Sequence, residues 1–245
     1  ENVSFSHCVP TLLHMMLNDP KSQEIDFTGR KFLIGGSAIP RSLVRQALDR
    51  GIDIFTGYGM SETGPVQVIN HLSKAEIELP LEEQIDIRRR AGRPVMLCDV
   101  RTVDETGKQL PRDGKSQGEI VFRSPWLSQG YLDNQSASDE LWSDGWLHSG
   151  DIGIFSADFS LQICDRKKDV IKSGGEWISS LDLENLISTH PHVNEVAVIA
   201  TPDSKWGERP LAIISLKPDT GERLTTEELA KHLQSHVDSS TLSKF

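Results

Sequence analysis

Residues 30–59 read "RKFLIGGSAIPRSLVRQALDRGIDIFTGYG", and this stretch decides the fold. The first part, 30–37, is a short apolar run that leads into glycines, which is typical of a buried strand. The middle part, 40–51, indicates a helix that stops at a glycine. The last part, 52–59, is another apolar run ending in glycines. Strand, helix and strand in this order predict a βαβ unit with parallel strands.

The residues before this stretch continue the same alternation. Residues 3–9, "VSFSHCV", indicate a strand, and residues 10–19, "PTLLHMMLND", indicate a helix with proline in its first turn. In open parallel sheets, ligands gather at the carboxyl ends of the strands. The glycine clusters Gly35–Gly36 and Gly57–Gly59 both stand at such ends, so we expect ligand contacts there.

From about residue 92 the pattern changes to short strands broken by turn residues. Residues 103–110, "VDETGKQL", and 155–163, "FSADFSLQI", resemble hairpins. This region is therefore expected to form a small, mostly antiparallel β unit.

A third pattern begins near Asp165. A helix is predicted after Ser179, its candidate N-cap, with Asp182 three residues on. Two apolar strands follow at 194–202 and 210–218, and then a helix over 225–237, whose Thr225 and Glu228 fit a capping box. The expected fold is thus α/β and α+β: a partial parallel βαβ unit over 1–91, a β-rich subdomain over 92–165, and a small α+β domain over 166–245 that is cut off at its end.

Composition favours an ordinary globular protein. The chain has 245 residues, of which 37% are hydrophobic and 25% charged, and its net charge is −10. A negative balance repels phosphate backbones, so we expect no nucleic-acid partner. The one dense basic run, at residues 88–90, follows acidic residues in a predicted helix, and we interpret it as a solvated helix face.

Targeting signals and metal-ligand spacings are not evident. The three cysteines lie far apart, which indicates reduced thiols in a cytoplasmic protein. No apolar run approaches the roughly 20 residues that a membrane helix needs, so no integral membrane segment is expected. The chain opens without an initiator methionine, and we interpret it as a piece of a longer protein.

The most informative motif is "GYGMSETGP", residues 57–65. Glycines on both sides of Tyr58 let the backbone approach a ligand, and the tyrosine ring can face a purine. Ser61 can donate to a phosphate oxygen, and the carboxylate of Glu62 can hold Mg²⁺. The alternative is a simple strand-end turn with a capping serine and glutamate.

Two later motifs carry polar side chains next to glycine turns. "GWLHSGDIG", 145–153, places Asp151 where a carboxylate could accept hydrogen bonds from ribose hydroxyls, although a lone aspartate is more often a turn former. His148, in the same motif, is interpreted as structural. "DRKKDVIKSGGEWIS", 165–179, gathers basic side chains before Gly174 and Gly175, which could hold a polyphosphate or a ribose. A charged surface hairpin is the alternative, and we prefer it for Lys167.

Together the motifs resemble the superfamily of adenylate-forming (AMP-binding) enzymes, which includes acyl- and aryl-CoA synthetases, luciferases and peptide-synthetase adenylation domains. The resemblance covers essentially the whole chain. Within the superfamily, the strings "IKSGGEWISS" and "KWGERP" are most similar to medium- and long-chain fatty acyl-CoA synthetases and methylmercaptopropionate-CoA ligases. In chain order, the strings that carry the resemblance are "VPTLL", "GGSAIP", "GYGMSETGP", "GRPV", "GEIVFRSPWLSQGY", "DGWLHSGDIG", "DRKKDVIKSGGEWIS" and "WGERP".

The resemblance implies a role for each matching residue. Lys168 would be the hinge of the small C-terminal domain, and Lys172 would act with the following turn when coenzyme A is bound. The implied cofactors are ATP or AMP, Mg²⁺ and coenzyme A. The other implied contacts are Gly36 and Ser37 in the adenine and acyl pocket, Gly57, Tyr58 and Gly59 around adenine, Ser61 at the α-phosphate, Glu62 on Mg²⁺, Asp151 and Arg166 on the ribose, and Gly174 and Gly175 on coenzyme A.

The implied activity is acyl-CoA synthesis from a carboxylic acid, here a fatty acid, through an acyl-adenylate with release of AMP and pyrophosphate. Two parts of the family pattern, an upstream phosphate loop ending in Pro-Lys and a catalytic lysine near the C-terminus, are not found in these residues. We therefore expect the 245 residues alone to be inactive. One alternative is an adenylation enzyme that loads a carrier-protein thiol, which "IKSGGEWISS" disfavours. Another is a non-catalytic nucleotide-binding module. Acyl-chain length and oligomeric state stay open.

Overall fold

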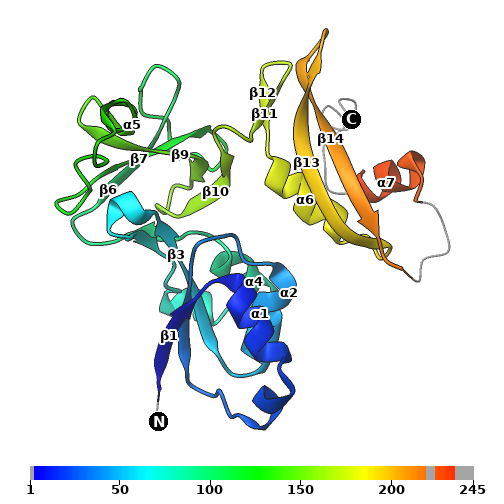
Figure 1. Ribbon diagram of the computed structural model, residues 1–245. Coiled ribbons are helices and arrows are strands. Elements are labelled where there is room, and N and C mark those ends of the chain that lie inside the picture. Colours follow the sequence, from blue (N-terminus) through cyan, green and yellow to red (C-terminus); the bar gives the residue numbers. More distant parts are fainter. Residues whose placement is uncertain (1–2, 219–223, 235–245) are drawn as a thin grey trace. The chain divides into compact units, whose positions relative to one another are not determined.

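The computed structural model describes residues 3–218 and 224–234, and the chain divides into two units (Figure 1). The first unit runs to Ser149 and includes Gly153–Ile163. The second consists of Gly150–Ile152 and the chain from Cys164 onward.

The first unit begins with a mixed sheet and its helices. Its elements are β1 (Phe5–Cys8), α1 (Pro10–Asn18), the 3-10 helix η1 (Pro20–Glu24), β2 (Lys31–Ile34), α2 (Arg41–Asp49), β3 (Asp53–Gly59), the 3-10 helix η2 (Ser61–Thr63), β4 (Val66–Ile69), α3 (Lys74–Ile77), α4 (Leu81–Arg88) and β5 (Arg93–Pro94). The strand order is β1-β2-β3-β4-β5. β1, β2 and β3 are parallel, which confirms the predicted βαβ arrangement, whereas β4 and β5 join in antiparallel register.

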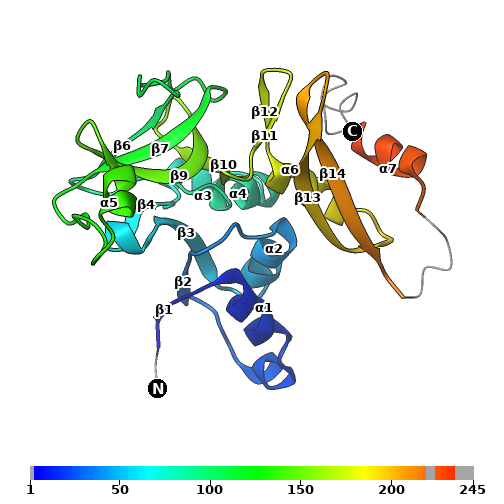
Figure 2. The same cartoon turned by 45° about the horizontal axis from the view of Figure 1, so that its top comes forward.

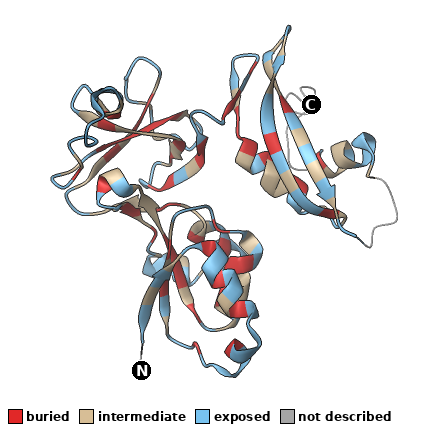
Figure 3. Ribbon diagram, in the orientation of Figure 1, coloured by how far each residue is buried: buried red, intermediate tan, exposed pale blue. Residues whose placement is uncertain are grey.

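Apolar side chains of the helices pack against the parallel strands. Leu13 of α1 and Val44 of α2 are fully buried in one cluster with Ile34 and Ile54 of the sheet. Figure 2 shows α1 and α2 together beside these strands, and Figure 3 marks buried residues along the strands and both helices. Removing this apolar surface from water stabilises the arrangement and holds the strand ends in place.

The basic run at the end of α4 corrects our sequence interpretation, because it is not a solvated helix face. Arg88 is 7% exposed, and its Nη1 donates to Asp53 Oδ1 at 2.9 Å and to the carbonyl oxygen of Ile54. Arg89 Nε donates to the carbonyl oxygen of Ile39 at 3.1 Å. A buried guanidinium is tolerated when a carboxylate balances its charge. The Nε of Arg88 is buried without a hydrogen-bond partner among the described residues.

An antiparallel sheet follows, as the short strands and turns predict. Its elements are β6 (Asp99–Val103), β7 (Gln117–Arg123), α5 (Gln135–Leu141), β8 (Trp142–Ser143), β9 (Trp146–Phe155) and β10 (Leu161–Arg166), with the strand order β10-β9-β7-β6 and β8 paired to β9. Both predicted hairpins close with a backbone hydrogen bond, from Asp104 N–H to Lys108 and from Ser156 N–H to Ser160. Phe122 and Phe155 are among its fully buried core residues.

The second unit is an α+β structure. Its elements are β11 (Ile171–Ser173), β12 (Glu176–Ile178), α6 (Ser180–Ser188), β13 (Val193–Asp203), β14 (Gly207–Leu216) and α7 (Thr226–Leu233), with the strand order β12-β11-β14-β13. The predicted caps are present: Ser179 Oγ accepts from Asp182 N–H, and Thr225 and Glu228 form a reciprocal capping box. The predicted continuation of the last helix beyond residue 234 lies outside the described residues.

Two sequence observations can be compared directly with the structure. All three cysteines are free. Within 3–218 and 224–234, no helix has both the length and the apolar character needed to cross a bilayer.

Replacing Arg88 with alanine should lower the free energy of unfolding by about 2 kcal/mol, because a buried carbonyl group loses its charged donor. This decrease should be smaller than the decrease caused by breaking a fully buried ion pair, because the Asp53 side chain is 41% exposed and can be rehydrated. Urea denaturation of the full-length gene product measures the change. Arg90→Ala is the control and should stay within about 0.5 kcal/mol. Equal effects of the two substitutions would contradict the buried role of Arg88.

Candidate functional site

The end of β3 turns back into β4 at a position that requires glycine. A Cβ atom at Gly59 would lie 1.7 Å from the carbonyl oxygen of Pro65. Thr63, which is fully buried, closes the turn: its Oγ1 accepts from Met60 N–H at 2.9 Å and lies 2.6 Å from the same Pro65 oxygen. The resulting turn presents Ser61 and Glu62 at the carboxyl end of a buried strand.

Glu62 is held by a residue far away in the sequence. The hydroxyl group of Tyr131 donates to Glu62 Oε1 at 2.6 Å, and the backbone N–H of Ser128 donates to the Glu62 carbonyl at 2.8 Å. The hydrogen bond to the carboxylate raises the pKa of the Tyr131 phenol, so that it remains a donor at neutral pH. Among the described residues, Glu62 Oε2 has no hydrogen-bond or ion-pair partner. Ser61, next to it, is exposed.

The two glycine clusters lie next to each other, as expected for neighbouring parallel strands. A Cβ atom on Gly35 would be 3.2 Å from the carbonyl oxygen of Gly57. Gly36 has φ of 87°, a conformation that favours glycine, and Ser37 follows it. The structure therefore brings the two glycine clusters together at Gly35 and Gly57. The Tyr58 ring is half-buried and packs against Phe122, with ring centroids 5.8 Å apart.

The donor set at the β3 end fits a magnesium ion bound together with a nucleotide. Mg²⁺ at such sites typically takes one or two carboxylates and completes its shell with phosphate oxygens and water. Glu62 offers one carboxylate oxygen that has no partner within the described part of the chain. No group of three His, Cys, Asp or Glu side chains that could hold a metal occurs among the described residues.

Asp151 and Arg166, the two predicted ribose contacts, come from the paired strands β9 and β10 and lie close together. Arg166 Nε is 3.7 Å from Asp151 Oδ1. The Asp151 side chain is 17% exposed, whereas that of Arg166 is 67% exposed. A carboxylate accepts hydrogen bonds from hydroxyl groups, and a guanidinium donates them, so the pair offers both functions to a polar ligand. Both residues belong to the second unit, whereas the β3 end belongs to the first.

Lys168 lies in an exposed turn directly after β10. The turn is closed by hydrogen bonds from Asp169 N–H and Val170 N–H to the Arg166 carbonyl, at 2.9 and 2.8 Å. On its N-terminal side, buried Asp165 is bound across the turn to the start of α6. Its Oδ2 accepts from the N–H and the Oγ of Ser180, at 2.6 and 2.8 Å.

The predicted turn at Lys172–Gly175 is a two-residue β-hairpin loop between β11 and β12. Ser173 pairs with Glu176, and Gly174 and Gly175 have φ of 61° and 83°. Positive φ at both loop residues is the preferred geometry of such hairpins. Two hydrogen bonds connect the hairpin to the residues at the start of β14. Gly174 N–H donates to the Trp206 carbonyl at 2.8 Å, and Lys172 N–H donates to Glu208 Oε2 at 2.7 Å.

Sequence reasoning missed two long-range pairs. Tyr131 ends the quoted motif "GEIVFRSPWLSQGY", and that string was the only available signal for its contact with Glu62. The partner of His148 was also missed: its Nδ1 lies 3.1 Å from Glu119 Oε2, and the Glu119 side chain is 9% exposed. This pairing agrees with a structural role for His148.

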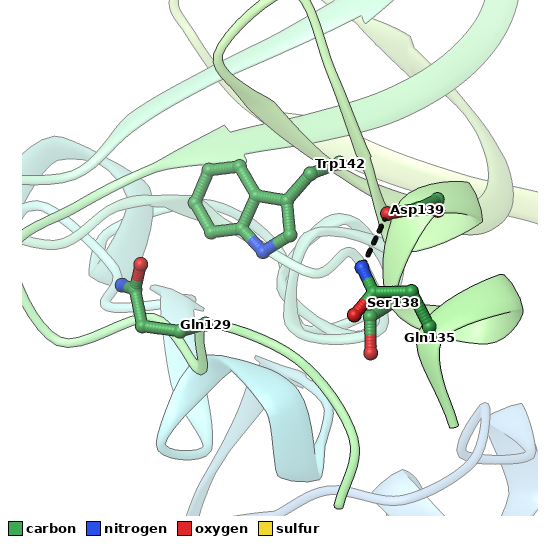
Figure 4. A pocket seen from close by; sticks show the side chains of 5 residues that line it. All are labelled: Gln129, Gln135, Ser138, Asp139 and Trp142. Carbon is green, nitrogen blue, oxygen red and sulfur yellow. Dashed lines mark hydrogen bonds between the residues drawn. The ribbon is translucent and has the colours of Figure 1, made fainter. Parts of the chain in front are cut away.

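The segment that carries Tyr131 also lines a surface hollow of about 300 Å³ (Figure 4). Gln129 lies on one side of it and α5 on the other, and the ring of Trp142 also lines it. On α5, Gln135 Nε2 donates to Asp139 Oδ1 at 2.7 Å. The remaining lining residue is Ser138.

Comparison with known proteins agrees with the motif resemblance. A long-chain-fatty-acid–CoA ligase of Thermus thermophilus is 41% identical over 235 residues, which cover 95% of this chain and 43% of that protein. A 3-methylmercaptopropionyl-CoA ligase of Ruegeria lacuscaerulensis is 38% identical over 206 residues, covering 84% of this chain and 38% of that protein. The chain thus spans less than half the length of these curated relatives, and they are of the two kinds that the motifs predicted.

A solved structure agrees in fold. The o-succinylbenzoate coenzyme A synthetase from Bacillus subtilis in complex with ATP and magnesium ion has a TM-score of 0.77 at 26% identity, over 98% of this chain and 46% of that one. The family model described as AMP-binding enzyme matches residues 1–132, and the one described as AMP-binding enzyme C-terminal domain matches residues 182–244. Because the first model alone covers more than half of its residues, this chain belongs to the AMP-binding, adenylate-forming enzyme family.

Proposed function

We propose that this chain supplies adenosine-binding and domain-hinge parts of an AMP-forming acyl-CoA synthetase that activates a fatty acid. The observation that carries the proposal is Glu62, whose carboxylate is fixed on one oxygen by Tyr131 and has no partner on the other within the described residues. It stands at the carboxyl end of parallel strands, where such sheets bind ligands. The fatty-acid substrate is supported by the name of the Thermus thermophilus relative.

The chemistry explains why a nucleotide is needed. A carboxylate acylates poorly because oxide is a very poor leaving group. Attack of the carboxylate on the α-phosphorus of ATP forms a mixed anhydride, the acyl-adenylate, and releases pyrophosphate. The thiol of coenzyme A then attacks the acyl carbon, and AMP leaves with the electron pair of the broken C–O bond. The protein contributes mainly positioning and stabilisation of charge on the five-coordinate phosphorus.

In this proposal, each predicted residue has one physical task. Ser61 donates its hydroxyl to the α-phosphate, and Glu62 holds Mg²⁺, which supplies positive charge against the phosphate oxygens. Asp151 accepts from the ribose hydroxyls, with Arg166 beside it. The remaining proposed contacts are Gly36, Ser37, Gly57, Tyr58 and Gly59 with adenine and the acyl group, and Lys172, Gly174 and Gly175 with coenzyme A.

A panel of carboxylic acids, assayed with ATP, Mg²⁺ and free coenzyme A, tests the proposal in the full-length gene product. We expect acyl-CoA and AMP in equal amounts, with the highest kcat/KM for fatty acids. Acyl-adenylate formation without acyl-CoA would favour a carrier-protein thiol as the acceptor. Nucleotide binding without pyrophosphate exchange, for any acid in the panel, would instead favour a non-catalytic module.

Asp151→Ala in the full-length gene product should lower kcat/KM for ATP by about 100-fold or more, because two charge-assisted hydrogen bonds to the ribose are lost. The melting temperature should change little. Steady-state kinetics with varied ATP measures the effect. Asp49→Ala, which removes an exposed carboxylate at the end of α2, is the matched control. If Asp151→Ala keeps the kcat/KM of the control, the aspartate is not part of the site.

Lys168→Pro tests the proposed hinge. Proline fixes φ near −65°, so the substitution should restrict rotation at residue 168. We expect acyl-adenylate formation at a near-normal rate, with thioester formation slower by about two orders of magnitude, because the second half-reaction needs a different pose of the domain. Single-turnover measurements of each half-reaction provide the test.

Lys168→Ala is the matched control, since it removes the charge and leaves the backbone free. Proline is disfavoured at the third position of a closed turn, the position that residue 168 occupies, so local damage must be distinguished from hinge locking. A normal first half-reaction makes that distinction. Equal slowing of both half-reactions, or of neither, would contradict the hinge assignment.

A further inference from the structure

We propose that Tyr131 is the residue that positions Glu62 for magnesium: its hydroxyl fixes Oε1 so that Oε2 is presented to the ion. The inference rests on the proposed function, because it concerns the same nucleotide site. It adds to that function a residue that never touches the ion or the nucleotide.

The contact between the two residues is specific and is created by the fold. A hydroxyl-to-carboxylate distance of 2.6 Å is in the range of strong charge-assisted hydrogen bonds. The residues are 69 positions apart, and a second bond, from Ser128 N–H to the Glu62 carbonyl, fixes the backbone of η2 to the same loop. Side chain and backbone of Glu62 are therefore held by one segment.

That segment is itself held in place by α5 and by the first residue of β8. Tyr131 N–H donates to Ser138 Oγ at 2.8 Å, and the indole Nε1 of Trp142 donates to the Ser128 carbonyl at 3.1 Å. Gly130 leaves the space that Ser138 occupies, since a Cβ atom there would lie 2.7 Å from Ser138 Oγ. The labelled positions of Ser138 and Trp142 in Figure 4 show both anchors close to the hollow.

The chemical consequence concerns freedom of rotation. An unrestrained glutamate side chain samples many rotamers, and binding an ion requires one of them. With Oε1 engaged, rotation of the carboxylate is restricted before the ion arrives. Partners that orient a metal ligand in this way typically change metal affinity by about 10-fold to 100-fold when they are removed.

Tyr131→Phe is the decisive variant, because it removes the hydroxyl group and keeps the ring. The full-length gene product is titrated calorimetrically with α,β-methylene-ATP, which cannot be cleaved between the α- and β-phosphates, at a series of Mg²⁺ concentrations. Mg²⁺ increases the nucleotide affinity up to a plateau. We expect the Mg²⁺ concentration that gives half of this increase to rise by about 10-fold. Affinity measured in EDTA should stay unchanged. Loss of affinity both with and without Mg²⁺ would indicate a merely structural role and would overturn the proposal.

Two further variants make the result specific. Ser128→Ala removes a hydroxyl from the same loop while keeping both backbone hydrogen bonds, and it should match the wild type. Glu62→Gln should reduce the Mg²⁺ dependence, and adding Tyr131→Phe to it should change nothing more. Additive effects in this cycle would contradict the proposal. A wild type without any Mg²⁺-dependent binding would overturn the proposed function as well, whereas a Tyr131→Phe variant that matches a responsive wild type overturns only the role of Tyr131.

Discussion

The turn at Gly59 is the constraint on which the β3 end depends. At this position the backbone passes so close to Pro65 that a hydrogen atom is the largest side chain that fits. The close passage lets β4 return antiparallel beside β3, and it leaves the short helix η2 at the end of the strand. Ser61 and Glu62 therefore owe their position to the absence of a side chain at residue 59.

Local patterns were enough to predict most of the fold. Apolar runs that end in glycine identified β2 and β3, and hydroxyl and carboxyl side chains at the right spacing identified the caps of α6 and α7. These signals work because strand burial and helix capping involve residues that are near one another in the chain. The polar residues of the candidate site were likewise predicted from the strings in which they stand, and their roles remain predictions.

The errors arose where a side chain is satisfied by a distant partner. Arg88 belongs to a basic run that reads as solvated, and only the fold shows that Asp53, on another element, neutralises it. The contact between Tyr131 and Glu62 was missed for the same reason, because nothing near Glu62 in the sequence indicates a phenol from another loop as its partner. Sequence patterns express spacing along the chain, whereas the satisfaction of a buried or functional charge is decided in space.

The carboxylate of Asp165 has a consequence for the backbone around the turn at Lys168. It receives two hydrogen bonds from Ser180 and one from the backbone of Arg166, so it ties residues on both sides of the turn at 168 to each other. A rotation confined to residue 168 would separate the two ends of this tie, and bonds to a charged group contribute about 1.5–3 kcal/mol each. Asp165 and Ser180 thus resist a backbone rotation at this turn, because such a rotation would have to break their hydrogen bonds.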